Sequence, residues 1–176
     1  MRKVYLLTLS LMLLFIFPAC DREQASDTVI KEVTVTSKGR VIQSIVMPLE
    51  KNTDLEEVSA SFQSLTADPD VSIPYVKIGK IIQIEFSDTA PDSYNLTDYI
   101  LRDDGTFKYK KETATPVTVE FEDKTATFKL DSNMASFLSS DSKDYEAGAT
   151  IRGFRLTGEW VDQTKEITFV VRTDAK

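Results

Sequence analysis

The stretch VTVEFEDKTATFKL, residues 117–130, decides the fold because apolar side chains recur at every second position on both sides of a short polar link. The alternating residues are Val117, Val119, Phe121, Ala126, Phe128 and Leu130. A period of two places these side chains on one face of a strand and the Thr, Glu and Lys residues on the other. The link EDKT (122–125) suits a hairpin. The stretch therefore predicts two antiparallel strands with one face in water.

Short segments of the same kind occur along the rest of the chain. Near the C-terminus the alternation is Ile167, Phe169 and Val171. The earlier segments are VIKEVTV (29–35), RVIQSIVM (40–47), VSASFQS (58–64), KIIQIEF (80–86), DYILR (98–102) and TFKYKK (106–111). The links between them are rich in Gly, Pro, Asn and Asp. Many short strands at this spacing predict an all-β fold, an antiparallel β-sandwich.

Helix is scarce in the predicted fold. The best candidate is DSNMASFLSS (131–140), where Met134, Phe137 and Leu138 fall at i, i+3 and i+4 behind Asp131 or Ser132 as a possible cap. This spacing predicts a short helix. The segment TDLEEV (53–58) is predicted to form a single turn.

The N-terminus carries a targeting signal. Two basic residues are followed by an uncharged, apolar run of fourteen residues, Val4–Phe17, which is shorter than the ~20 residues of a spanning helix. The run ends just before Cys20. The arrangement resembles the lipobox of bacterial lipoproteins, which implies removal of residues 1–19, acylation of Cys20 by palmitate-like chains and a membrane tether through lipid. Residues 20–27 would form a solvated linker. The alternatives are a plain signal peptide with a stray thiol, or an uncleaved anchor.

The charge balance excludes several partners. The chain contains 28 acidic and 21 basic residues, for a net charge of −7. An acidic surface repels phosphate backbones and anionic headgroups, so nucleic acid and peripheral lipid are not expected partners. Cys20 is the only cysteine, so no disulfide within the chain can stabilise the fold.

A second resemblance covers residues 28 to about 113. The order MPLEKNTDLEEVSASFQ, DVSIP and YILRDDGTFKYKK is similar to the Ig-like repeat domains of Bacteroidota surface lipoproteins. Its most specific piece is the Asp103–Thr106 hairpin, DDGT, in which Asp-Gly suits a type I′ turn. The resemblance implies an Ig-like domain over 28–114. Residues 115–176 are expected to form a second small β unit or extra strands of the same sandwich.

Reactive groups are few. The chain has no histidine, so the commonest general base and the usual zinc ligand are missing. Glycine-rich phosphate loops are also missing. Carboxylates remain, and a glycosidase needs two of them ~5 to 10 Å apart. We expect no enzyme activity and no cofactor other than a possible calcium ion. Its oxygen ligands could come from Asp68 and Asp70, or from Asp141, Asp144 and Glu146.

One aromatic residue is the main candidate for ligand binding. Trp160, the only tryptophan, precedes a polar turn and lies beside Glu159, Asp162 and Gln163, a composition that could bind a sugar. Alternatively, Trp160 continues the inward face after Phe154 and fills the core. The expected function is a non-catalytic binding module of a lipid-anchored outer-membrane surface lipoprotein, for glycan, beside a nutrient-uptake system. The alternative is a structural or adhesive accessory that docks other envelope proteins and has no small ligand.

Overall fold

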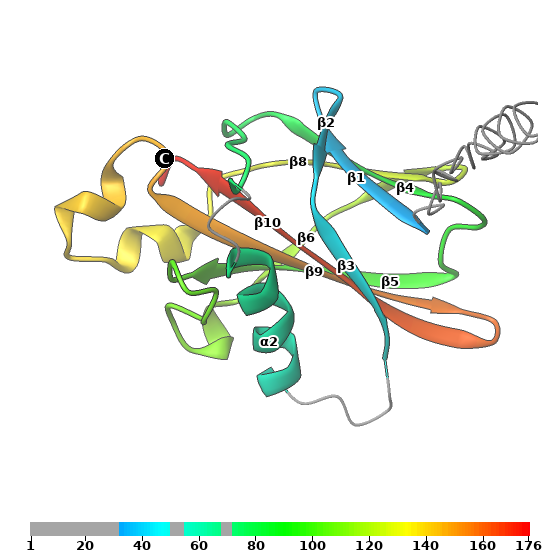
Figure 1. Ribbon diagram of the computed structural model, residues 1–176. Helices are drawn as coiled ribbons and strands as arrows, with labels where there is room; N and C mark the ends of the chain where they lie inside the picture. The colour runs from blue at the N-terminus through cyan, green and yellow to red at the C-terminus, as the bar shows by residue number, and fades with distance from the viewer. Residues whose placement is uncertain (1–31, 50–54, 68–71) are drawn as a thin grey trace, which may run out of the picture.

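The computed structural model describes residues 32–49, 55–67 and 72–176, which form two five-stranded antiparallel sheets. The predicted signal segment, Cys20, the linker 20–27, Asp68 and Asp70 lie outside the described residues. The first sheet has the order β2 (Arg40–Ile42), β1 (Val33–Ser37), β4 (Ile81–Phe86), β8 (Thr125–Lys129) and β7 (Glu120–Glu122). The second has the order β3 (Ser44–Pro48), β10 (Gln163–Thr173), β9 (Thr150–Trp160), β5 (Ser93–Leu101) and β6 (Thr115–Val117). The predicted all-β antiparallel sandwich is confirmed (Figure 1).

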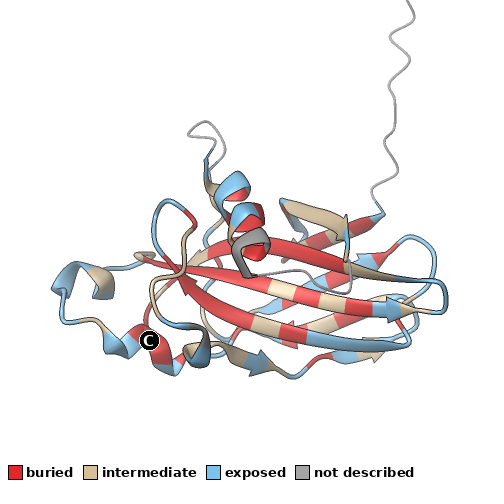
Figure 2. Cartoon of the chain, turned by 90° about the horizontal axis from the view of Figure 1, so that it is seen from below, coloured by how far each residue is buried: buried red, intermediate tan, exposed pale blue. Residues whose placement is uncertain are grey.

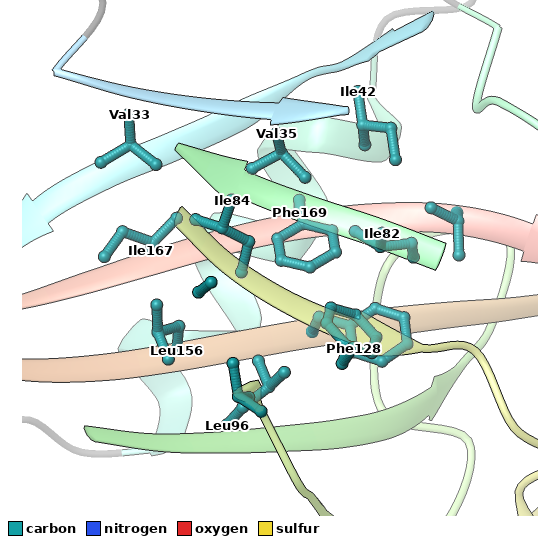
Figure 3. Packing of buried hydrophobic residues seen from close by; sticks show 14 of the residues in the cluster. Val33, Val35, Ile42, Ile82, Ile84, Leu96, Phe128, Leu156, Ile167 and Phe169 are labelled. Atoms are coloured by element: carbon teal, nitrogen blue, oxygen red, sulfur yellow. The ribbon is translucent and has the colours of Figure 1, made fainter. Parts of the chain in front are cut away.

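The main core lies between the two sheets. Val35, Ile84 and Phe128 from the first sheet belong to one cluster with Leu156 and Phe169 from the second, and all are buried (Figure 3). Each of these residues belongs to an alternating segment of the sequence. The alternation of apolar and polar residues in the sequence therefore predicted these inward-facing side chains correctly.

Two predicted strands are each divided between the two sheets. Segment 40–47 breaks at Gln43: β2 pairs with β1 in the first sheet, and β3 pairs with β10 in the second. Segment 117–121 breaks after Val117 in the same way, because β6 pairs with β5 and β7 pairs with β8. Both halves contribute side chains to the same core, so the alternation continues across each corner. The hairpin predicted at 122–125 is confirmed, with Glu122 opposite Thr125.

The prediction of a strand at 58–64 is wrong, because these residues lie in the helix α2 (Leu55–Thr66). Val58, Phe62 and Leu65 recur at i, i+4 and i+7 and are buried against the second sheet. Their partners on the sheet are Tyr99, Leu101, Ile151 and Val170. The second sheet is therefore covered on both faces, by the first sheet and by α2, and its central strands are buried almost throughout (Figure 2).

The predicted helical segment 131–140 forms one short 3-10 helix, Met134–Leu138. The cap is Asn133, whose side-chain oxygen accepts from the Ala135 amide at 2.8 Å, rather than Asp131 or Ser132. The large apolar side chains of this turn do not face the core, although Ala135 is buried. Met134 and Leu138 are 75% and 61% exposed.

The Asp103–Thr106 link is not a type I′ turn, since Gly105 alone has a positive φ there, of 80°. The predicted strand 106–111 is also absent, and only one bridge joins Phe107 to Leu101. The I′ geometry occurs instead in the β1–β2 hairpin, where Lys38 and Gly39 have φ values of 51° and 74°.

Both sheets mix strands from before and after residue 115. Strand β8 pairs with β4, and β9 lies between β5 and β10. The strands of residues 115–176 therefore extend the same sandwich and do not form a separate sheet.

Candidate functional site

Trp160 closes one end of the sandwich. Its ring is half-buried against the main core, with its centroid 6.0 Å from that of Phe86. The indole Nε1 donates to the Thr89 carbonyl at 3.0 Å. Gly158 makes room for the ring, because a Cβ at that position would lie 2.7 Å from Trp160 Cζ3. These contacts agree with the core alternative.

The three polar neighbours of Trp160 do not surround an open ring. Glu159 is exposed and accepts from Ser93 Oγ at 2.8 Å. Gln163 lies opposite Trp160 in the register of β9 and β10, and Asp162 lies in the intervening turn. The structure therefore places the four predicted residues at one hairpin end, where tryptophan packs inward.

Tyr94, Tyr99 and Tyr145 do not form a shared exposed platform with Trp160. Tyr99 is buried under α2, and Tyr145 lies in the 131–149 segment. That segment and the β9–β10 turn are at opposite ends of the molecule (Figure 1). The Tyr94 ring packs at a tilt of 41° against Phe121, with ring centroids 4.4 Å apart.

In the predicted calcium loop, the carboxylates of Asp141 and Asp144 already bind other groups of the protein. Asp144 Oδ2 pairs with Lys108 Nζ at 2.5 Å and also accepts from the Ser139 hydroxyl. Asp141 caps the 3-10 helix Ser142–Tyr145 by accepting from the Lys143 amide at 3.0 Å, and Glu146 is exposed. Hydrogen bonds from Lys108 and Ser139 lower the pKa of Asp144. Among the described residues no three acidic, cysteine or histidine side chains converge as a metal site requires.

A large, open cavity with a volume of about 1090 Å³ lies beside β7 and β8 of the first sheet. We call it the acidic groove. It is lined by polar residues from β4, β7 and β8 and from the loop 88–90, with Phe121 as the one aromatic residue. Its charged lining residues are Asp88, Glu120, Glu122, Asp123 and Lys124.

A row of polar side chains on three neighbouring strands makes the lining of this groove polar. Gln83, Thr127 and Glu120 lie directly opposite one another on β4, β8 and β7, so an amide, a hydroxyl and a carboxylate share one face. Thr89 lies at the rim, and its carbonyl accepts the Trp160 hydrogen bond. Trp160 thus supports the groove from behind and does not line it.

A second cavity of about 500 Å³ lies between the sheets beside β6 and β8. It reaches a buried ion pair, in which Arg152 Nη2 and Nε donate to the two Asp98 oxygens at 2.5 and 3.1 Å. Asn133 Nδ2 also donates to Asp98 Oδ2, at 2.5 Å. Arg152 Nη1 donates to the Asp131 carbonyl at 2.5 Å, which completes the network.

Burial is the main influence on the Asp98 carboxyl. Desolvation raises its pKa above the ordinary value, while Arg152 and Asn133 stabilise the charged form. Because all the partners are fixed side chains or backbone groups, this network suits a structural role in joining strands β5 and β9 to the 131–133 segment.

Glu166 is the other carboxylate that is buried among the described residues. Arg155 Nε donates to Glu166 Oε2 at 2.6 Å, and the register places this pair on the opposite face of the second sheet from Asp98. The sheet therefore separates the two buried acids. They do not form the carboxylate pair of a glycosidase.

The acidic groove and the Asp98 network were not among the predicted sites. The groove depends on the predicted β7–β8 hairpin and also on the pairing of β8 with β4, which no local pattern specifies. The sequence did contain a signal for the ion pair. Asp98 lies two residues from Leu96, and Arg152 two residues from Phe154, so both charged residues occupy inward positions of their strands. A charge at an inward strand position requires a buried partner.

The chain matches no protein family, no curated protein and no solved structure. Within the described residues no helix is both long and apolar enough to cross a bilayer.

Proposed function

We propose that this protein is a lipid-anchored surface lipoprotein of the outer membrane that acts as a non-catalytic glycan-binding module. The observation that carries the binding role is the acidic groove. Sugars offer many hydroxyl groups, and the row of Gln83, Thr127 and Glu120 supplies donors and acceptors for them in an open cavity of about 1090 Å³.

The tether is proposed from the sequence before residue 20. Two or three acyl chains on Cys20 anchor a protein stably, whereas one chain binds only marginally. Acylation makes two measurable predictions: labelled palmitate enters the chain, and Cys20→Ser releases the protein from the membrane fraction. An unlabelled chain, or a Cys20→Ser protein that stays in the membrane, overturns the tether and leaves the groove proposal intact.

Affinity electrophoresis of the full chain in detergent, through gels containing neutral polysaccharides, tests the binding role. At least one polysaccharide should retard the protein. Gln83→Ala with Thr127→Ala should weaken retardation about tenfold, because the pair removes two hydrogen-bonding groups. The matched control is Asn95→Ala with Glu112→Gln, which changes exposed polar residues outside the groove.

Two outcomes contradict the proposal. Either no polysaccharide retards the chain, or the groove variant migrates like the control. Sugar release from a retarding polysaccharide would contradict the non-catalytic assignment. The separation of Asp98 from Glu166 by a sheet, and the absence of histidine from the sequence, both support binding without turnover.

The alternative is a structural or adhesive accessory with no small ligand. One observation favours it: Met134 and Leu138 are 75% and 61% exposed on the 3-10 helix Met134–Leu138. Neighbouring exposed apolar side chains are typical of protein contacts. The double variant Met134→Ser with Leu138→Ser would abolish capture of an envelope protein while leaving polysaccharide retardation unchanged.

A further inference from the structure

A concentration of positive charge lies at the β1–β2 hairpin, in a groove that shares no lining residue with the acidic groove. A cavity of about 360 Å³ is lined there by Lys38, Arg40, Lys77, Lys80 and Tyr75, together with smaller neighbours. We call it the basic groove. Every charged residue that lines it is a cation, although the whole chain has a net charge of −7.

These four cations have no acidic partner among the described residues. Each ion pair of that part of the chain involves another basic residue, and none joins Lys38, Arg40, Lys77 or Lys80 to a carboxylate within 4.0 Å. Four like charges around one concavity repel one another and concentrate a positive potential in it. An anion bound in the groove would relieve this repulsion.

The backbone that carries the cations is fixed. Lys38 lies in the type I′ turn, and Ser37 Oγ donates to the Ile81 carbonyl at 2.9 Å. On the facing segment the Val76 amide donates to the Arg172 carbonyl at 2.8 Å, and the Lys80 amide donates to the Lys77 carbonyl at 3.1 Å. The groove is therefore formed before a ligand binds, which lowers the entropic cost of binding.

Tyr75 gives the groove an aromatic wall. The residue is 47% exposed, and its hydroxyl donates to Asp174 Oδ2 at 2.6 Å. Gly148 lies beside the ring, since a Cβ at that position would make an ordinary van der Waals contact of 3.5 Å with Tyr75 Cδ2. A ring held at its hydroxyl end presents a fixed flat surface to a cyclic ligand.

We infer that the basic groove binds an acidic saccharide unit, whose oxyanion pairs with Lys77, Lys80, Lys38 or Arg40 while its ring packs on Tyr75. Anion binding here stands on the groove alone; the choice of a saccharide rests on the proposed glycan function. A bilayer surface is the wrong shape, because the cations line a concavity of about 360 Å³, near the lower end of the range for small-ligand sites.

The test is an NMR titration of the full chain in zwitterionic detergent with four soluble probes. These are glucuronate, glucose, inorganic phosphate and glycerol 3-phosphate, the last representing anionic lipid headgroups. Glucuronate should shift the amide signals of Tyr75, Lys77 and Lys80 and bind more tightly than any other probe. Its affinity should fall as salt is added, since exposed charges are screened.

Variants test the charge contacts of the lysines and the ring contact of Tyr75 separately. Lys77→Gln with Lys80→Gln should weaken glucuronate binding about tenfold or more, because two charge-assisted contacts are lost. Tyr75→Ala should weaken glucuronate binding but not phosphate binding, and Tyr75→Phe should retain the ring contact. The control, Lys110→Gln with Lys143→Gln, removes two exposed lysines outside the groove and should change nothing.

Each remaining outcome has a defined meaning. If the Lys77/Lys80 variant binds glucuronate as well as the control does, or if glucose binds equally well, the anion site is overturned. If both phosphates bind as tightly as glucuronate and Tyr75→Ala has no effect, the saccharide assignment is overturned. Neither result depends on the acidic groove, since Gln83→Ala with Thr127→Ala leaves the basic groove unchanged.

Discussion

Asp98 and Arg152 show how one ion pair can dominate the stability of this sandwich. Both side chains are buried, so removing one partner leaves a charge without compensation. We expect Asp98→Asn or Arg152→Met to lower the free energy of unfolding by about 3–5 kcal/mol. Urea denaturation of the wild type, both single variants and the double variant would measure the coupling.

The matched control for this pair is Lys129 and Asp131, which are 3.0 Å apart and exposed. Asp131→Asn should cost less than about 1 kcal/mol, because surface ion pairs are weak. A buried-pair variant no less stable than this control would contradict the structural role assigned to Asp98.

Asp144 should make stability depend on pH in the acid range. Its folded-state pKa lies below the unfolded value because Lys108 and Ser139 stabilise the carboxylate. The contribution is therefore present above the unfolded pKa of about 3.9 and is lost as the pH falls through the lower, folded value. Urea titrations should show Asp144→Asn less stable than wild type at pH 7 and nearly equal to it near pH 2. A constant difference at both pH values would contradict this cause.

At the scale of elements, the packing of helix α2 on the second sheet depends on the aromatic ring of Phe62. Phe62 is fully buried, with ring centroids 5.9 Å from Tyr99 and 6.0 Å from Phe107. Phe62→Ala should lower the free energy of unfolding by about 3–5 kcal/mol through the cavity it leaves. The control is Ser64→Ala on the exposed face, which should cost under about 1 kcal/mol in the same chemical denaturation. Equal effects would mean that the helix does not pack as described.

The helix was missed because its sequence satisfies two periods. In VSASFQS, Val58, Ala60 and Phe62 alternate as a strand would, while Val58, Phe62 and Leu65 also fit a helix. The choice between strand and helix depends on the face of the second sheet against which these residues pack. Gly153 on β9 leaves room for Phe62, since a Cβ there would lie 2.8 Å from its ring. That contact joins residues too distant in sequence for a local pattern to reveal.

At the scale of the whole molecule, local pattern predicted which side chains face inward but not which sheet they belong to. At Gln43 and after Val117 the chain passes from one sheet to the other, and the alternation of inward and outward side chains is the same before and after each crossing. For the same reason the composition near Trp160 suggested a site, whereas each groove needs segments that meet only in the folded chain: β4 beside β8 for the acidic groove, and two separate segments for the basic groove. The lysines of the basic groove lie on two segments, 37–42 and 74–80.

The mixing of strands predicts that residues 28–114 and 115–176 cannot fold separately. The N-terminal segment alone would leave β5 without β9 and β4 without β8, which exposes both inner faces. The C-terminal segment would keep the β7–β8 and β9–β10 hairpins, which belong to different sheets, and isolated hairpins are marginal in water. Each segment alone should give a poorly dispersed NMR spectrum and no cooperative urea transition. The whole chain should unfold in one transition. A dispersed spectrum from either segment would show instead that residue 115 begins an independent unit, because only a complete core fixes side chains in distinct environments.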